Sequence, residues 1–233
     1  NQVNNFNMTR TDNNYVQTID ISSLLTSDKK IVTFVGTSKN GTSFIVNNIA
    51  ELMSSMGINV AILDTTVNRN SYYIYTKNEE SLRSIAASSI EGLVQGVANG
   101  IQVNKNLTVF TSLPDDEDSI KNVDEILETL VKNYSLILID CDFNTPVGYF
   151  KQSLETYLIQ SLDILTIQPL TAFLRELKSK NILDEKKLKI ILNKFVKVKG
   201  VSEKTIIGGM AFYNDPAMSF MTELFDRNMI RYI

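Results

Sequence analysis

The sequence contains no histidine and a single cysteine, Cys141, among its 233 residues. The absence of histidine excludes catalytic triads that use an imidazole and every metal site with a histidine ligand. One cysteine cannot form a disulfide within the chain. Carboxylates, hydroxyls and lysines are therefore left to perform any chemistry.

Long apolar runs and an excess of positive charge are also missing. No segment approaches the roughly 18 consecutive apolar residues of a membrane helix, so we expect a cytoplasmic protein that makes no membrane contact. The formal net charge of −3 and the pI near 5.2 restrict any binding of nucleic acid to a local surface. The hydrophobic content of 43% is ample for a buried core.

The first 28 residues differ in composition from the rest of the chain. They are rich in asparagine, threonine and serine, with few apolar residues before Ile19–Leu25. This composition predicts a flexible leader or interdomain linker over residues 1–28, followed by one domain over residues 29–233. Because the chain opens at Asn1 rather than methionine, we expect it to be part of something longer.

Short and almost continuous apolar runs recur after residue 28, as is typical of strands buried on both faces of a parallel sheet. The expected strands are Ile31–Val35, Val60–Leu63, Leu107–Thr111, Leu136–Ile139, Ile164–Ile167 and Leu188–Leu192. Apolar residues at helical spacing predict one helix from Ile45 to Met56, stopped by Gly57, and another from Ile120 to Val131. The alternation predicts an α/β fold, with a mostly parallel sheet between two helical layers and ligands at the carboxyl ends of the strands.

A loop with two glycines joins the first expected strand to the first expected helix. It reads Gly36-Thr37-Ser38-Lys39-Asn40-Gly41-Thr42-Ser43. Seven of the eight positions fit the phosphate-loop pattern G-x-x-x-x-G-K-[ST], whose backbone N–H groups bind phosphates and whose last hydroxyl holds Mg²⁺. Thr42 replaces the lysine, and losing a charged hydrogen bond of ~1.5–3 kcal/mol weakens nucleotide binding by one to two decades. The alternative is an ordinary connection whose glycines serve backbone geometry alone.

Four segments resemble the MinD/ParA-type ATPases, a deviant Walker family of partition and positioning proteins. They are Lys30–Ser43, Asn59–Asp64, Tyr134–Asp140 and Ile190–Lys194. The resemblance implies a P-loop NTPase-like fold with a site for ATP or ADP with Mg²⁺. The family loop is K-G-G-x-G-K-[ST], whereas this chain has Thr37 and Thr42 at the lysines and Lys39 where the family has glycine. The first family lysine reaches across a dimer, so Thr37 argues against ATP-driven dimerisation of that kind and leaves a homodimer an open alternative.

The same resemblance assigns roles to three further residues. Asp64 matches the first acid of the family's D-x-D switch pair, and Thr66 replaces the second; the alternative for Asp64 is a carboxylate that caps a turn. Asp140 ends the strand that resembles Walker B, so Ser43, Asp64 and Asp140 are the expected Mg²⁺ ligands, with Asp142 left to solvent. Asn193 matches the residue that reads the adenine edge, although asparagine after a strand is also a good turn residue.

These observations predict a degenerate MinD/ParA-like protein, a nucleotide-binding or pseudo-ATPase scaffold in partition, in positioning or in a mobile element, with an unknown protein partner. One alternative is an active ATPase in which Lys39, or a lysine from a partner, restores the charge. Another is a partition protein that binds DNA without sequence preference, because Lys178–Lys204 contains nine lysines and three acidic residues. Phe212–Pro216 takes the place of the family's base-contacting loop, and the helix expected around Met218–Phe225 is predicted to pack on the core.

Overall fold

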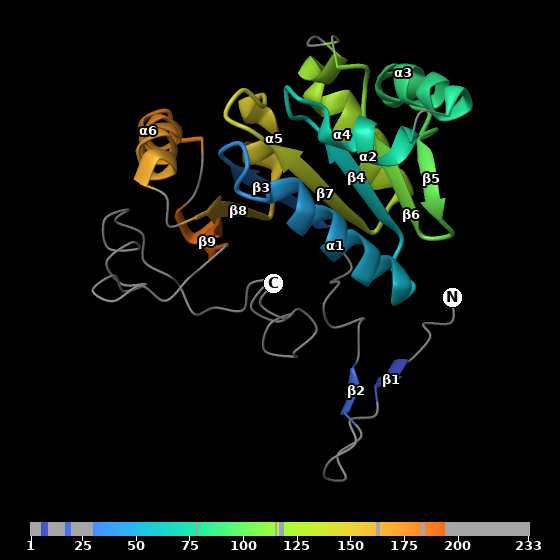
Figure 1. Ribbon diagram of the computed structural model, residues 1–233, viewed down its shortest axis with the longest axis horizontal. Helices are drawn as coiled ribbons and strands as arrows, with labels where there is room; N and C mark the ends of the chain where they lie inside the picture. Colours follow the sequence, from blue (N-terminus) through green and yellow to red (C-terminus); the bar gives the residue numbers. More distant parts are fainter. Residues whose placement is uncertain are drawn as a thin grey trace.

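The structure, a computed structural model, describes residues 6–8, 17–19, 30–77, 79–114, 116, 119–161, 164–182 and 185–193. Its centre is a seven-stranded sheet in the order β5-β6-β4-β7-β3-β8-β9 (Figure 1). The strands are β3 Lys30–Gly36, β4 Val60–Asp64, β5 Ile101–Asn104, β6 Leu107–Phe110, β7 Leu136–Cys141, β8 Glu155–Gln160 and β9 Leu188–Leu192. Every neighbouring pair is parallel except β5 with β6 at one edge. The predicted mostly parallel α/β fold is therefore confirmed.

Helices cover both faces of this sheet. They are α1 Thr42–Ser55, α2 Asn70–Thr76, α3 Glu80–Val94, α4 Val123–Asn133, α5 Val147–Gln152 and α6 Ile164–Ser179. One buried cluster joins Val32 and Phe34 of β3 to α1, and a second joins Ile31 and Val35 to α4, α5 and α6. Because side chains alternate along a strand, β3 supplies both clusters and lies between them. The result is the three-layer arrangement expected from the continuous apolar runs.

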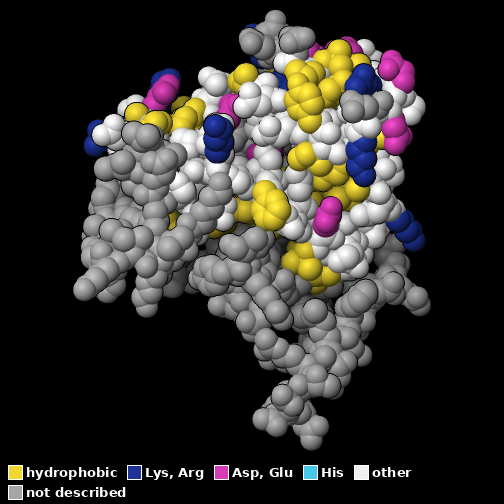
Figure 2. Space-filling model, in the orientation of Figure 1, with side chains coloured by type: hydrophobic (Ala, Val, Ile, Leu, Met, Phe, Trp, Pro, Cys, Tyr) yellow, Lys and Arg dark blue, Asp and Glu magenta, His cyan; other side chains and the backbone are white. Residues whose placement is uncertain are grey.

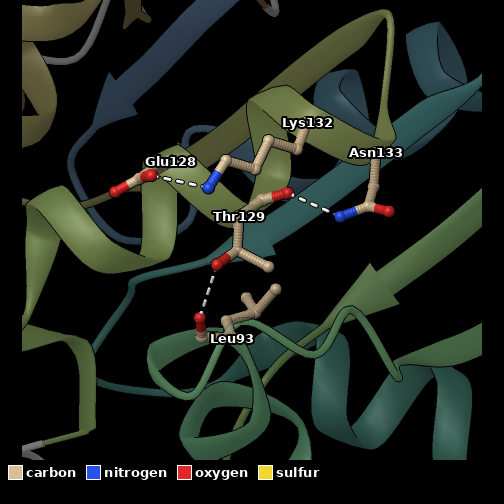
Figure 3. A network of polar contacts seen from close by, with 5 residues as sticks. All are labelled: Leu93, Glu128, Thr129, Lys132 and Asn133. Carbon is tan, nitrogen blue, oxygen red and sulfur yellow. Dashed lines mark hydrogen bonds and ion pairs between the residues drawn. The ribbon is translucent and has the colours of Figure 1, made fainter.

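Helix α4 is fastened to α3 on one side of the sheet. The Thr129 hydroxyl donates a hydrogen bond to the Leu93 carbonyl oxygen at 2.7 Å, and the Asn133 amide donates to the Thr129 carbonyl oxygen at 2.8 Å (Figure 3). On the outer surface of α4, Lys132 pairs with Glu128 at 2.6 Å. Exposed pairs of this kind contribute little, so the buried Thr129 bond is the contact that fixes α4 here.

The structure corrects two sequence predictions and adds two strands to the sheet, the edge strand β5 and the internal strand β8. Ile164–Ile167, expected as a strand, is the first turn of α6. The helix predicted from Ile120 begins as a separate 3-10 turn, Ser119–Lys121, and α4 starts at Val123. Strand β8 was not predicted because Glu155, Thr156 and Gln160 interrupt its apolar run, although the strand is almost wholly buried.

Several predictions concern residues at or beyond the limits of the described chain. Within the expected leader, β1 Phe6–Met8 and β2 Gln17–Ile19 pair as a two-stranded antiparallel sheet. Phe212–Pro216, Met218–Phe225 and the lysines from Lys194 onward lie outside the described residues.

Part of the outer surface of α1 and α2 is apolar. Phe44, Tyr73 and Ile74 expose 51%, 64% and 44% of their surface. Figure 2 shows hydrophobic side chains in several groups on the face that carries these helices. Among the described residues, no helix is both long enough and apolar enough to cross a membrane.

Candidate functional site

The predicted site residues come together because three strands lie side by side. Strand β7 pairs with β4 on one side and β3 on the other, which places Asp140 opposite Asp64 and Cys141 opposite Val35. The phosphate-loop segment follows β3 directly. The loop, Asp64 and Asp140 are therefore neighbours at the carboxyl ends of the strands, where α/β sheets bind ligands.

Asn40 anchors the middle of the loop. It is 3% exposed, and its Nδ2 donates to the Thr37 hydroxyl at 2.6 Å and to the Ile159 carbonyl oxygen of β8 at 3.3 Å. The Asn40 carbonyl oxygen accepts a hydrogen bond from Asn193 Nδ2 at 2.7 Å, and the Asn40 N–H donates to the Thr37 carbonyl oxygen at 3.2 Å. The loop is thus held by β8 and by Asn193, which follows β9 and whose amide nitrogen bonds the loop backbone.

The start of α1 lacks the groups that usually satisfy a helix N-terminus. Gly41, at the N-cap with a φ of 86°, makes no side-chain capping bond, and the first turn contains no acidic residue. The buried Thr42 hydroxyl oxygen also has no hydrogen-bond partner. An uncapped helix start with an unsatisfied hydroxyl is a favourable place for an anion, as the sequence pattern predicts.

Gly36 is required by close packing at the point where β3 enters the loop. A Cβ atom at this position would lie 2.5 Å from the Thr42 hydroxyl oxygen and 2.8 Å from the Ile159 carbonyl oxygen. These contacts are far shorter than real Cβ atoms make, and one of them is to backbone. Any side chain here must push β8 and the loop apart.

We therefore expect Gly36→Ala to lower stability and, if the loop binds a nucleotide, to lower the affinity for that nucleotide as well. The overpacking should cost about 1–3 kcal/mol in the free energy of unfolding, measured by urea titration. Gly96→Ala is the matched control, because its Cβ would meet nothing within 4 Å while its φ of +84° still imposes strain. The control should lose stability and keep the affinity of the wild type; equal affinities for all three proteins would contradict this account of Gly36.

Asp140 is a buried carboxylate without hydrogen bonds of good geometry. It is 1% exposed, and no hydrogen bond of good geometry reaches either oxygen. Burial raises the pKa of Asp140 well above its usual value, nearby Asp64 and Asp142 raise this pKa further, and the adjacent Ser43 hydroxyl lowers it. Leaving a carboxylate unsatisfied in the interior is costly, so the position is strained until a cation or donor arrives.

Asp64 differs from Asp140 because the protein itself satisfies both of its oxygens. Oδ1 accepts from the Thr66 N–H at 3.0 Å and the Thr66 hydroxyl at 2.7 Å, and Oδ2 accepts from the Ser71 N–H at 2.8 Å. Burial raises the pKa of Asp64, and these hydrogen bonds together with Arg69 oppose that rise. Asp64 holds the loop between β4 and α2 in place, which is the capping alternative left open for it.

Arg69, which no sequence pattern singled out, is the largest fully buried side chain among the described residues. Its Nε donates to Ser112 Oγ at 2.8 Å, and its two terminal nitrogens donate to the carbonyl oxygens of Thr66 at 2.6 Å and Asp116 at 2.8 Å. Its positive charge lowers the pKa of Asp64. Arg69 therefore joins the loop after β4 to the loop after β6 and places one positive charge beside the acidic residues.

The residues present fit a magnesium ion in part. Mg²⁺ prefers oxygen ligands and usually retains water while using one or two carboxylates and phosphate oxygens. Asp140 and the adjacent Ser43 hydroxyl offer such oxygens, whereas those of Asp64 are engaged. The described residues contain no group of three or more carboxylates and thiols close enough to hold a metal alone. An ion here would need phosphate or water oxygens as well.

The lysines that the sequence singled out differ in how far their surroundings are described. Lys39 is exposed near the tip of the loop with a φ of 68°. Within Lys178–Lys204, Lys189 is 8% exposed, and Lys187 Nζ donates to the Ser153 carbonyl oxygen at 3.4 Å. The DNA-binding surface predicted for this segment stays a prediction.

Comparison with known proteins gives structural relatives and no sequence family. No protein-family model matches the sequence, and no match to a curated protein was found. A ParA family ATPase from Chlorobium tepidum superposes with a TM-score of 0.59 at 19% identity, over 78% of this chain and 81% of that one. A Borrelia burgdorferi plasmid partition protein bound to AMPPNP gives 0.59 at 17% identity, over 87% of this chain and 100% of that one.

A third relative is a cell-division protein. The septum site-determining protein MinD of Pyrococcus horikoshii, complexed with Mg-ADP, superposes with a TM-score of 0.56 at 18% identity, over 80% of this chain and 79% of that one. At such low identity these likenesses concern the fold. The chain therefore has the fold of the ParA/MinD-type P-loop ATPases.

Proposed function

We propose that this protein binds a magnesium-nucleotide complex at the loop Gly36–Ser43 and acts as a partition- or positioning-type scaffold with little or no hydrolysis. The observation that carries the proposal is Asp140, a buried carboxylate without partners next to Ser43 and at the end of the strand beside the loop. A relic of a nucleotide site would be expected to have replaced or satisfied this group, because its burial is costly.

Two threonines at the site favour binding over catalysis. Thr42 offers a hydroxyl where a lysine would neutralise phosphate charge, and Thr66 uses its hydroxyl to bond Asp64. Asp64, Asp140 and Asp142 surround the site with carboxylates, so phosphates would meet repulsion unless a cation accompanies them. Bound Mg²⁺ would supply this charge, which predicts that nucleotide affinity depends strongly on magnesium.

The missing lysine can be restored. Thr42→Lys should tighten binding of Mg-ADP and Mg-ATP by about 10- to 100-fold, because a charged hydrogen bond to phosphate contributes ~1.5–3 kcal/mol. Thr42→Met has a side chain of similar length without charge and should leave binding no tighter than in the wild type. Calorimetric titration of the three proteins measures the difference.

Turnover measured on the same proteins tests the catalytic part of the proposal. We expect no steady release of phosphate from the wild type, and no fast release from Thr42→Lys because Thr66 still replaces the second acid. Lys39→Ala examines the alternative in which Lys39 is the substitute cation. Turnover in the wild type that disappears in Lys39→Ala or in Asp140→Ala would establish an active ATPase and overturn the scaffold.

A further inference from the structure

Asn70 connects the loop after β4 to the phosphate loop. It is the first residue of α2, and its Nδ2 donates a hydrogen bond to Ser43 Oγ at 3.0 Å across 27 positions of sequence. Both residues are partly exposed at the mouth of the site. This amide is therefore in direct contact with the hydroxyl that the phosphate-loop pattern assigns to magnesium.

The bonding capacity of the Ser43 hydroxyl is limited. A serine hydroxyl has one hydrogen to donate and two lone pairs to offer. The Asn70 amide nitrogen is a donor, so it occupies one lone pair. The Asp140 carboxylate beside Ser43 can accept the hydrogen, consistent with the lowering of the Asp140 pKa by this hydroxyl. One lone pair of Ser43 then stays available for a cation next to Asp140.

The residues next to Asn70 at the start of α2 are fixed by hydrogen bonds. Asp64 Oδ2 accepts the N–H of Ser71 at 2.8 Å, and the Arg69 carbonyl oxygen accepts the N–H of Tyr72 at 3.0 Å. Arg69 is itself fixed by three hydrogen bonds, of which those to Ser112 and Thr66 are buried. The residues on both sides of Asn70 are thus anchored, so its amide is presented to Ser43 by a preformed support.

We propose that Asn70 is a positioning residue for magnesium: its amide orients the Ser43 hydroxyl so that the free lone pair faces the ion's place beside Asp140. The inference rests on the proposed function and goes beyond it by assigning to Asn70 and its support a role in metal binding. This role affects the binding of Mg²⁺ and not the binding of free nucleotide, because Asn70 acts only through the Ser43 hydroxyl. Removing the amide should weaken the response to Mg²⁺ without changing the binding of free nucleotide.

The test compares ADP binding with and without magnesium in the full chain. Wild type and Asn70→Ala are titrated calorimetrically with ADP in excess Mg²⁺ and again in EDTA. The affinity in Mg²⁺ should fall about three- to tenfold in the variant, as expected for one hydrogen bond, while the affinity in EDTA stays the same. Asn48→Ala is the matched control, because Asn48 is an exposed amide on α1 that bonds the Phe44 carbonyl oxygen at 2.7 Å.

A double-mutant cycle shows whether the effect passes through Ser43. In a Ser43→Ala background, Asn70→Ala should have no further effect on the affinity in Mg²⁺. Equal losses in Mg²⁺ and EDTA, no loss at all, or an undiminished loss in the Ser43→Ala background would each overturn the role of Asn70. Failure of the wild type to bind ADP under either condition would instead overturn the proposed function, and the inference with it.

Discussion

Replacing Asp140 by asparagine is expected to stabilise the nucleotide-free protein and to remove its response to magnesium nucleotide. The wild-type carboxylate is buried without partners and lies near Asp64 and Asp142, so its ionised form is disfavoured. Removing that charge should raise the free energy of unfolding at neutral pH by about 0.5–2 kcal/mol, the range common for relief of a destabilised site. The loss of a magnesium ligand should abolish stabilisation by Mg-ADP.

The pH dependence of this effect follows from the direction of the pKa shift. Because the folded pKa of Asp140 is raised, the folded state holds a proton that the unfolded state has released in the interval between the two values. Stability of the wild type should therefore fall as pH rises through that interval, and Asp140→Asn should flatten this part of the profile. Thermal unfolding followed upward from the ordinary pKa of an aspartate, about pH 4, measures the change.

Asp142→Asn is the matched control, two residues further along the chain. The oxygens of Asp142 accept the N–H groups of Val67 at 2.7 Å and Asn144 at 2.8 Å, so this carboxylate is stabilising where Asp140 is not. Asp142→Asn should therefore lower the free energy of unfolding. A loss of stability for both variants would contradict the account of Asp140 as a strained and unsatisfied group.

Arg69→Met is expected to produce a larger loss of stability than either Gly36→Ala or Asp142→Asn. The substitution removes three hydrogen bonds and leaves the carbonyl oxygens of Thr66 and Asp116 with fewer donors. It also removes the positive charge that favours ionised Asp64. Disrupting a buried charged network in this way costs about 3–5 kcal/mol, measured as a shift in the urea unfolding midpoint.

Two further variants make the Arg69 result interpretable. Arg175 is exposed on α6, so Arg175→Met should change stability by less than about 0.5 kcal/mol. Arg69→Lys retains the charge but cannot make the same three divergent bonds, and it should fall between the wild type and Arg69→Met. A cost below about 1 kcal/mol for Arg69→Met would show that the buried guanidinium does not hold the two loops together.

The strands that could be predicted are those in which burial on both faces leaves a continuous apolar run. Strands β3, β4 and β7 meet this condition at nearly every position. The four residues Ile164–Ile167 look the same in a short window, because periodicity cannot separate a short strand from part of a buried helix. Their helical state becomes apparent only with Leu170, Leu174 and Leu177, which continue the spacing along α6.

The position of the candidate site could be inferred from local chain pattern, whereas the contacts that its residues make across the fold could not. Gly36–Ser43 stands out because a strand leads directly into it, and Asp140 because it follows a continuous apolar run within β7. Arg69 bonds Ser112 and Asp116 over 43 and 47 positions, so its polar neighbours in sequence suggest only a solvated turn. The different roles of Asp64 and Asp140 likewise depend on the fold. Hydrogen-bond donors lie close to the carboxylate of Asp64, and none is well placed for that of Asp140.

The most direct test of the central claim is a calorimetric titration of the wild-type protein with ADP in the presence and absence of Mg²⁺. If the loop after β3 and Asp140 form a working site without a lysine, one equivalent of Mg-ADP should bind with a dissociation constant on the order of 0.1 mM, and removal of Mg²⁺ should weaken binding strongly. Absence of binding at millimolar nucleotide, or equal affinity with and without the metal, would contradict the account.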